Sequence, residues 1–181
     1  MTMHKYLLPP AAEEFIAKNL TAVGIPYEDA YLVATLMIQS DLAGADGHGI
    51  FRLPAYIKRI RAGGINLHPN IRREREQGAV TLIDGDNGLG HLVMARVVET
   101  AIEKVKKYSV CWVGSHHGNH SGAASVYVRK IAEAGLIGIY MAVGNANHMA
   151  PWGGIDLLLS TNPIAIAVPA GEQPIVLLDI A

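Results

Sequence analysis

The sequence predicts an α+β fold, in which a helical N-terminal region precedes a region of alternating strands and helices. Two observations support this prediction. Up to about residue 70, apolar residues recur at the three- and four-residue spacing of amphipathic helices. From Ala79 onward, short apolar runs alternate with two further helical patterns. We therefore place a domain boundary between a helical region over residues 1–75 and a second domain over residues 76–181.

Three helices are expected in the first region. The first opens at Pro9 and is stopped by Gly24, since proline fits the first turn of a helix and glycine often ends one. Pro26 opens a second helix that continues to about Leu42. The third is centred on residues 56–60 and ends at a pair of glycines.

The second region is typical of short strands that alternate with helices. Amphipathic helices are expected over residues 92–107 and from about 123 to 134. Strands are expected over residues 79–83, 110–113, 136–143, 164–168 and 175–178. In this interpretation the turn-forming sequence Asp84–Gly88 ends the first strand.

Composition narrows the class of protein. Of the 181 residues, 50% are hydrophobic and 17% are charged, so a sizeable buried core is expected. The net charge of −1 gives no basic surface for nucleic acid, and no apolar stretch is long enough to span a membrane. The single cysteine, Cys111, cannot form an internal disulfide, which favours a reducing cytoplasm.

The segment Gly114–Gly122 carries three histidines among three glycines, between a strand-like run and a helix-like run. Histidine exchanges protons near neutral pH, so this predicted loop indicates an enzyme site. The spacing does not choose among His116, His117 and His120. A metal site is the alternative, but we expect none, because the segment is too rich in glycine to be helical and no suitably spaced carboxylate completes the set.

His48, Arg52 and Tyr56 are spaced four residues apart and would share one face of a helix. An arginine fork beside a histidine and a phenol could bind an anionic oxo or hydroxy acid. Pro54 complicates this reading, because it fits better at the start of a helix, with His48 and Arg52 on the preceding loop. A surface arginine and a histidine near a helix cap remain the alternative.

The segment Asp84–Gly90 lies where a phosphate-binding loop would lie, between a strand and a helix. Its glycines do not match the dinucleotide-binding fingerprint, and it lacks the lysine of a P-loop. We expect a tight turn.

Five motifs in one order then carry a resemblance: residues 40–56, 118–122, 149–154, 160–163 and 178–181. Together they resemble the malate/L-lactate dehydrogenase family of the second type, which also includes ureidoglycolate, diketogulonate and sulfolactate dehydrogenases and cyclic-imine-2-carboxylate reductases. The resemblance covers essentially the whole chain. It implies a non-Rossmann NAD(P)-binding fold, in agreement with the absent fingerprint.

The resemblance also implies roles for individual residues. His120 matches the catalytic histidine, which would protonate the substrate carbonyl or deprotonate the alcohol in reverse. His48, Arg52 and Tyr56 match the substrate-binding face. The positions that match cofactor contacts are Gly144, Asp179, Ile180 and Ala181. The resemblance therefore implies a protein that uses NAD or NADP on a small 2-oxo or 2-hydroxy acid and that forms a homodimer when complete. The cytoplasmic location rests on the single cysteine.

Two departures from the family pattern affect these expectations. Gly47 stands where family members usually have serine, so a hydroxyl that could bind substrate is absent. Family members are also nearly twice as long, so the chain is expected to be an N-terminal half with an incomplete mixed sheet flanked by helices. The alternatives are a non-catalytic remnant of such an enzyme and a cyclic-imine-2-carboxylate reductase.

Overall fold

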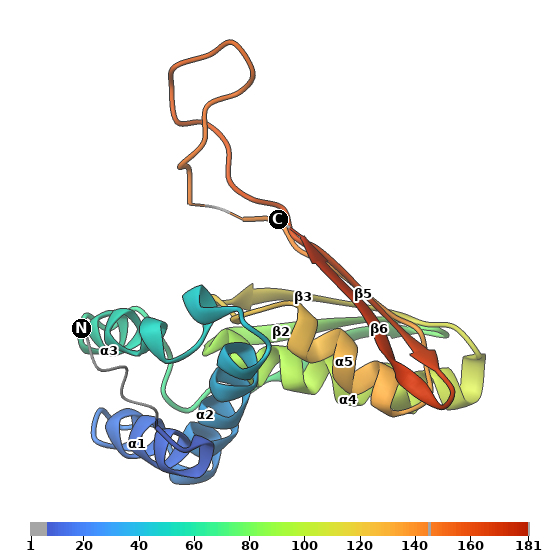
Figure 1. Cartoon of the computed structure of the whole chain (residues 1–181), viewed down its shortest axis with the longest axis horizontal. Coiled ribbons are helices and arrows are strands. Elements are labelled where there is room, and N and C mark those ends of the chain that lie inside the picture. Colours follow the sequence, from blue (N-terminus) through green and yellow to red (C-terminus); the bar gives the residue numbers. More distant parts are fainter. Residues whose placement is uncertain (1–6, 145, 181) are drawn as a thin grey trace. The chain divides into compact units, whose positions relative to one another are not determined.

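The structure is a computed structural model and describes residues 7–144 and 146–180 (Figure 1). It divides into two compact units, one up to Ala123 and one from Ala124 onward. The predicted boundary near residue 75 falls within the first unit, where the chain passes from helices to strands. A separate domain over residues 76–181 stays a prediction.

The three predicted N-terminal helices are present. They are α1 (Pro9–Thr21), α2 (Tyr27–Leu42) and α3 (Leu53–Arg61). Two short 3₁₀ turns, η1 (Asp46–His48) and η2 (Ile50–Arg52), lead into α3. Pro54 lies in the first turn of α3, where its missing N–H costs no helical hydrogen bond. His48 and Arg52 therefore precede the helix, and Tyr56 lies on it.

The first unit also holds a three-stranded sheet in the order β1-β2-β3. Its strands are β1 (Arg72–Gln77), β2 (Val80–Gly88) and β3 (Trp112–Gly118). β1 pairs with β2 in antiparallel register, and β2 pairs with β3 in parallel register after a crossover through α4 (Gly90–Tyr108). The sheet is therefore mixed, as parallel neighbours need a helical connection.

Two predictions for this sheet are wrong. The segment Asp84–Gly88 does not end β2; the strand continues to Gly88 with an irregular register, and Asp86 and Asn87 take left-handed backbone angles. Gly114–Gly118 is not a loop, because it extends β3 alongside β2. Parallel pairing to a neighbouring strand outweighs the turn preference of glycine and asparagine here.

The helices of the first unit enclose an apolar core. Its fully buried members include Ile16, Leu20, Val33 and Met37, which come from α1 and α2, and the two helices lie side by side in Figure 1. Leu53, Tyr56 and Ile60 of α3 are also buried, at the three- and four-residue spacing that the sequence predicts. Burial of this face orients Tyr56 inward from α3.

The second unit consists of one helix and one antiparallel sheet. Helix α5 (Ser125–Glu133) precedes β4 (Gly138–Met141), β5 (Ile164–Ala170) and β6 (Gln173–Ile180), which form a sheet in that order. Small residues of α5 and β5 make its core. The described strands thus form two sheets, one mixed and one antiparallel, where the sequence predicted a single mixed sheet.

Among the described residues, no helix is both long and apolar enough to cross a membrane.

Candidate functional site

Three aromatic side chains from two distant parts of the sequence meet in the first unit. The Tyr56 hydroxyl lies 2.7 Å from Nδ1 of His120. The His48 ring stacks on the His120 ring, with centroids 5.6 Å apart and an interplanar angle of 16°. The structure therefore brings together His48, Tyr56 and His120, three of the residues that the sequence proposed for one site.

The hydrogen bonds of His120 indicate which nitrogen carries its proton. The backbone N–H of Gly122 also points at Nδ1, at 3.4 Å. An N–H can only donate, so Nδ1 acts as an acceptor, and the Tyr56 hydroxyl donates to it. In the neutral ring this places the proton on Nε2. His120 thus has one nitrogen engaged by the protein and the other left with the exchangeable proton, as a proton-transfer residue requires.

The charge state of His120 depends on its surroundings. Burial of the ring, the Arg52 guanidinium and His48 together lower the pKa of His120 from 6.5 to about 4. The residue as a whole is nonetheless exposed to solvent. His120 is therefore neutral at pH 7 and ready to accept a proton. Burial also raises the pKa of Tyr56, so its phenol keeps the proton that it donates to His120.

Arg52 is half-buried, and a backbone carbonyl five residues earlier in the chain orients its side chain. Its Nε–H donates to the Gly47 carbonyl oxygen at 2.7 Å. The last turn of α2 holds the same segment in place, because the Asp41 carboxylate accepts the N–H of Ile50 at 2.9 Å. A Cβ at Gly49 would lie 1.8 Å from that carboxylate, so a larger residue would have to displace the Asp41 side chain from the Ile50 N–H. Asp41 and Gly49 are positioning residues that the sequence analysis missed.

Asn119 fixes the chain beside His120. Its side-chain N–H₂ donates to the carbonyl oxygens of Asn87 and Gly88, at 3.0 and 2.9 Å, and to the Asn87 side chain at 3.0 Å. Its side-chain oxygen accepts from Nε of Arg59 at 2.8 Å. One side chain therefore ties the His120 segment to both β2 and α3. Sequence spacing carried no signal for this role.

His91, another residue that the sequence analysis missed, lies behind Tyr56. It is fully buried at the start of α4, and its ring meets the Tyr56 ring edge-on at 5.5 Å. Neither ring nitrogen has a hydrogen-bond partner within the described part of the chain. Burial, with help from His120 and His48, lowers the pKa of His91 to about 3, so the ring is neutral. A Cβ at Gly122 would lie 2.8 Å from its Nε2, which explains the glycine there.

The residues expected to touch the cofactor lie in the second unit, where they make contacts within the protein. A Cβ at Gly144 would lie 2.3 Å from Oγ of Ser160, so glycine is needed for this close approach. The Asp179 carboxylate accepts the N–H of Ser125 at 2.8 Å, at the start of α5. Ile180, at the end of β6, is exposed. Ala181 lies outside the described residues.

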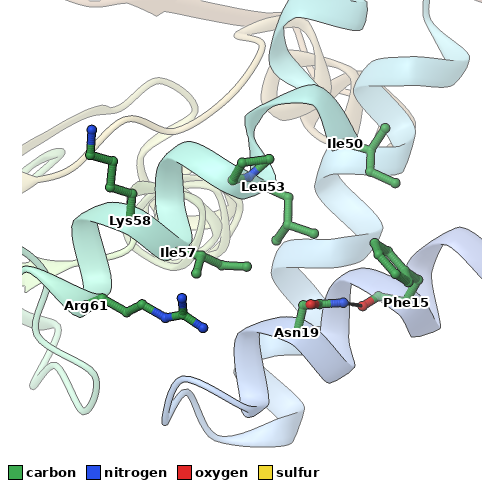
Figure 2. A pocket seen from close by; sticks show the side chains of 8 residues that line it. Phe15, Asn19, Ile50, Leu53, Ile57, Lys58 and Arg61 are labelled. Carbon is green, nitrogen blue, oxygen red and sulfur yellow. Dashed lines mark hydrogen bonds between the residues drawn. The ribbon is translucent and has the colours of Figure 1, made fainter.

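A cavity of about 570 Å³ lies apart from the histidine cluster, between α1 and α3. Figure 2 shows Phe15 and Asn19 of α1 opposite Leu53 and Ile57 of α3, with the side-chain amide of Asn19 bonded to the Phe15 carbonyl oxygen. Its lining is mainly apolar and contains no histidine or carboxylate. It therefore offers no group for proton transfer.

Comparison with known proteins identifies the family. A sequence model of the malate/L-lactate dehydrogenase family matches residues 9–181. The chain belongs to the malate/L-lactate dehydrogenase family. The resemblance found in the five sequence motifs is thereby confirmed.

Individual relatives differ in the acid named as substrate. The chain is 45% identical to malate dehydrogenase of Pyrococcus horikoshii over 92% of its length and 46% of the relative. It is 39% identical to L-sulfolactate dehydrogenase of Methanocaldococcus jannaschii, over 89% of its length and 46% of the relative. It is 33% identical to NAD⁺-dependent ureidoglycolate dehydrogenase of Escherichia coli K12, over 93% of its length and 48% of the relative. The chain thus spans about half the length of these relatives.

Solved structures share the fold. The P. horikoshii malate dehydrogenase structure superposes with a TM-score of 0.90 at 39% identity, over 100% of this chain and 53% of that one. The Δ¹-piperideine-2-carboxylate reductase of Pseudomonas syringae superposes with a TM-score of 0.84 over 98% of this chain and 53% of that one. At 23% identity, the latter supports the fold alone.

Proposed function

We propose that this chain carries the substrate-binding and proton-transfer residues of an NAD(P)-dependent 2-hydroxyacid dehydrogenase. The observation that supports it best is the neutral His120, held through Nδ1 by Tyr56 and lying within the field of Arg52. The reaction would interconvert a 2-oxo acid and a 2-hydroxy acid, as do the relatives named for malate, sulfolactate and ureidoglycolate.

In the oxidation direction, the ring would act as the tautomer that carries its proton on Nδ1 and donates it to the Tyr56 hydroxyl oxygen, so that the lone pair of Nε2 takes the proton of the substrate hydroxyl. A neutral imidazole suits this role, because it can accept a proton without first losing one. Tyr56 would hold the ring plane, and its hydroxyl can turn to accept from Nδ1 when the ring becomes charged.

In the reduction direction, His120 must arrive protonated. A substrate carboxylate bound to Arg52 would offset the positive charge that disfavours the imidazolium, so the pKa of His120 would rise when the 2-oxo acid binds. Binding of the acid and uptake of the proton would thus be coupled. Arg52 would serve both as the carboxylate clamp and as the group that adjusts the charge of His120.

The nicotinamide cofactor, when bound, would supply or accept the hydride at the substrate carbon. The first unit would supply the remaining groups that the reaction needs, with His120 as the proton carrier and Arg52 as the residue that binds the carboxylate. We propose that Gly144, Asp179, Ile180 and Ala181 contact the cofactor. Gly144 would do so through its backbone, since a Cβ there would meet Ser160, and so would Asp179, since its carboxylate accepts the Ser125 N–H. The non-Rossmann mode of binding belongs to the same proposal, and so do the homodimer and the cytoplasmic location.

Either nicotinamide cofactor is compatible with the relatives. The E. coli ureidoglycolate dehydrogenase is named for NAD⁺, and a (2R)-3-sulfolactate dehydrogenase of Chromohalobacter salexigens, 36% identical over 92% of this chain and 50% of that one, is named for NADP⁺. Assays should therefore include both cofactors.

The test is an absorbance assay of NADH or NADPH with pyruvate, oxaloacetate and sulfopyruvate. If the proposal holds, Arg52→Lys lowers kcat/KM at least about tenfold, because lysine cannot form the two-point contact to a carboxylate. His120→Gln lowers turnover by about two to four orders of magnitude and leaves cofactor binding intact. A folded chain that binds cofactor and acid without turnover would instead support the non-catalytic alternative.

A further inference from the structure

A second cluster of titratable side chains lies at one end of the first sheet, outside the His120 site. His116 and His117 are neighbours on β3, Asp84 is on β2 and Glu74 is on β1. Each strand of the sheet thus contributes at least one titratable side chain to the cluster. His120, which the sequence grouped with the other two histidines, is engaged with Tyr56 instead.

The backbone of β3 brings both histidines to the same side. In a regular strand, consecutive side chains point to opposite faces. His117 has a φ of 50°, a left-handed angle that is uncommon for a residue other than glycine. As a result the rings of His116 and His117 are only 4.2 Å apart between centroids.

The donor atoms converge closely. Nδ1 of His117 lies 3.1 Å from Oδ1 of Asp84, and Nε2 of His116 lies 2.8 Å from Oε2 of Glu74. One ligand atom from each of Asp84, His116 and His117 falls within 4.8 Å of the others. Two donors on one tetrahedral zinc ion, each at about 2.1 Å, are roughly 3.4 Å apart. Small side-chain rotations would therefore suffice to place an ion among them.

The charges at this cluster also suit a cation. The Asp84 side chain is 9% exposed, and Arg72 pairs with its other oxygen, Oδ2, at 2.5 Å. Oδ1 accepts the Asp86 N–H at 3.0 Å and faces His117. The carboxylates of Asp84 and Glu74 outweigh the one guanidinium, so the spot carries a net negative charge when both histidines are neutral.

We propose that Asp84, His116 and His117, with Glu74 as a fourth ligand, bind one divalent transition-metal ion such as Zn²⁺, Co²⁺ or Ni²⁺. Two imidazoles with carboxylates favour these borderline ions over Mg²⁺ and Ca²⁺, which select oxygen ligands. The ion would join all three strands of the sheet. It would therefore stabilise the sheet just before the chain reaches His120, and it would take no part in the proton transfer proposed above.

The test uses the whole chain without an affinity tag. Titration with Co²⁺ should give saturable visible absorption at one equivalent, calorimetry with Zn²⁺ should give the same stoichiometry, and the ion should raise the midpoint of thermal unfolding. Mg²⁺ at the same concentration should give no saturable binding in calorimetry and no rise in the midpoint of thermal unfolding. None of these readouts depends on dehydrogenase activity, so their failure leaves the proposed function untouched.

His117→Gln should weaken binding at least about tenfold, since even groups that only orient a metal ligand are worth that much. His116→Gln should do the same. The matched control is His68→Gln, because His68 is an exposed histidine of the same unit. Circular dichroism must show that each variant is folded. Absence of saturable binding, or binding that survives His117→Gln unchanged in the folded variant, would overturn the proposal.

Discussion

Arg52→Gln should raise the pKa of His120. Glutamine is shorter than arginine but keeps an N–H donor at the position of Nε, and it removes the positive charge. In the unaltered chain the pKa of His120 falls from 6.5 to about 4, with burial as the largest cause, then Arg52, then His48. Arg52 therefore accounts for less than half of the lowering, and its loss should raise this pKa by roughly half to one pH unit.

The assay is a pH titration of the histidine ring protons by NMR. The chain has eight histidines, and the His120 resonance is identified by its loss in His120→Gln. Arg61→Gln is the control, because it removes an equal charge from α3 at a position that lines the separate cavity. A 2-oxo acid should raise the pKa of His120 in the unaltered chain and have no such effect in Arg52→Gln. An unchanged or lower pKa in Arg52→Gln, or an equal rise in Arg61→Gln, would refute the reasoning.

Three further predictions concern stability. The folded pKa of His91 is about 3, below the unfolded value of 6.5, so its contribution to the free energy of unfolding is complete above pH 6.5 and is lost as the pH falls toward 3. In urea melts, His91→Gln should therefore reduce the loss of unfolding free energy between pH 7.5 and 5 by roughly 2 kcal/mol. Gly90→Ala should destabilise the chain by about 1–3 kcal/mol, because the new Cβ would lie 2.0 Å from a backbone oxygen. Gly47→Ala is the control and should change stability little, because nothing lies within 4 Å of its new Cβ. Similar unfolding midpoints for the two variants would contradict this account. Asp179→Ala should cost about 0.5–2 kcal/mol by removing the carboxylate that accepts the Ser125 N–H, and Asp179→Asn should recover most of it; a thermal melt with no change in either variant would exclude this capping role.

The helices were predictable because their signals are local. Prolines at the N-terminal ends, glycines after the last turns and a three- to four-residue apolar spacing define α1 to α3 without reference to the rest of the chain. β1 was missed because its sequence is Arg-Arg-Glu-Arg-Glu-Gln, with every residue exposed. Such a strand forms through pairing with β2 and through charged contacts, which no periodicity reveals.

The candidate site was predictable in its residue types and not in its geometry. Spacing joined His48, Arg52 and Tyr56, but the contact of Tyr56 with His120 spans 64 positions and exists only in the folded chain. His91 gave no signal, because a histidine in an apolar helical pattern looks the same whether it packs behind a site or lies elsewhere in a core. The loop prediction for His116 and His117 failed because their strand is defined by its parallel neighbour.

The saturated side-chain amide of Asn119 has a consequence for the thermodynamics of substrate binding. Its bonds to Asn87, Gly88 and Arg59 fix the His120 segment during folding, so little conformational entropy remains to be lost when a substrate arrives. In a chain loosened by Asn119→Ala, the same ordering would occur at each encounter with substrate. Calorimetry would then register weaker binding through a more unfavourable entropy, even though Asn119 need not touch the acid.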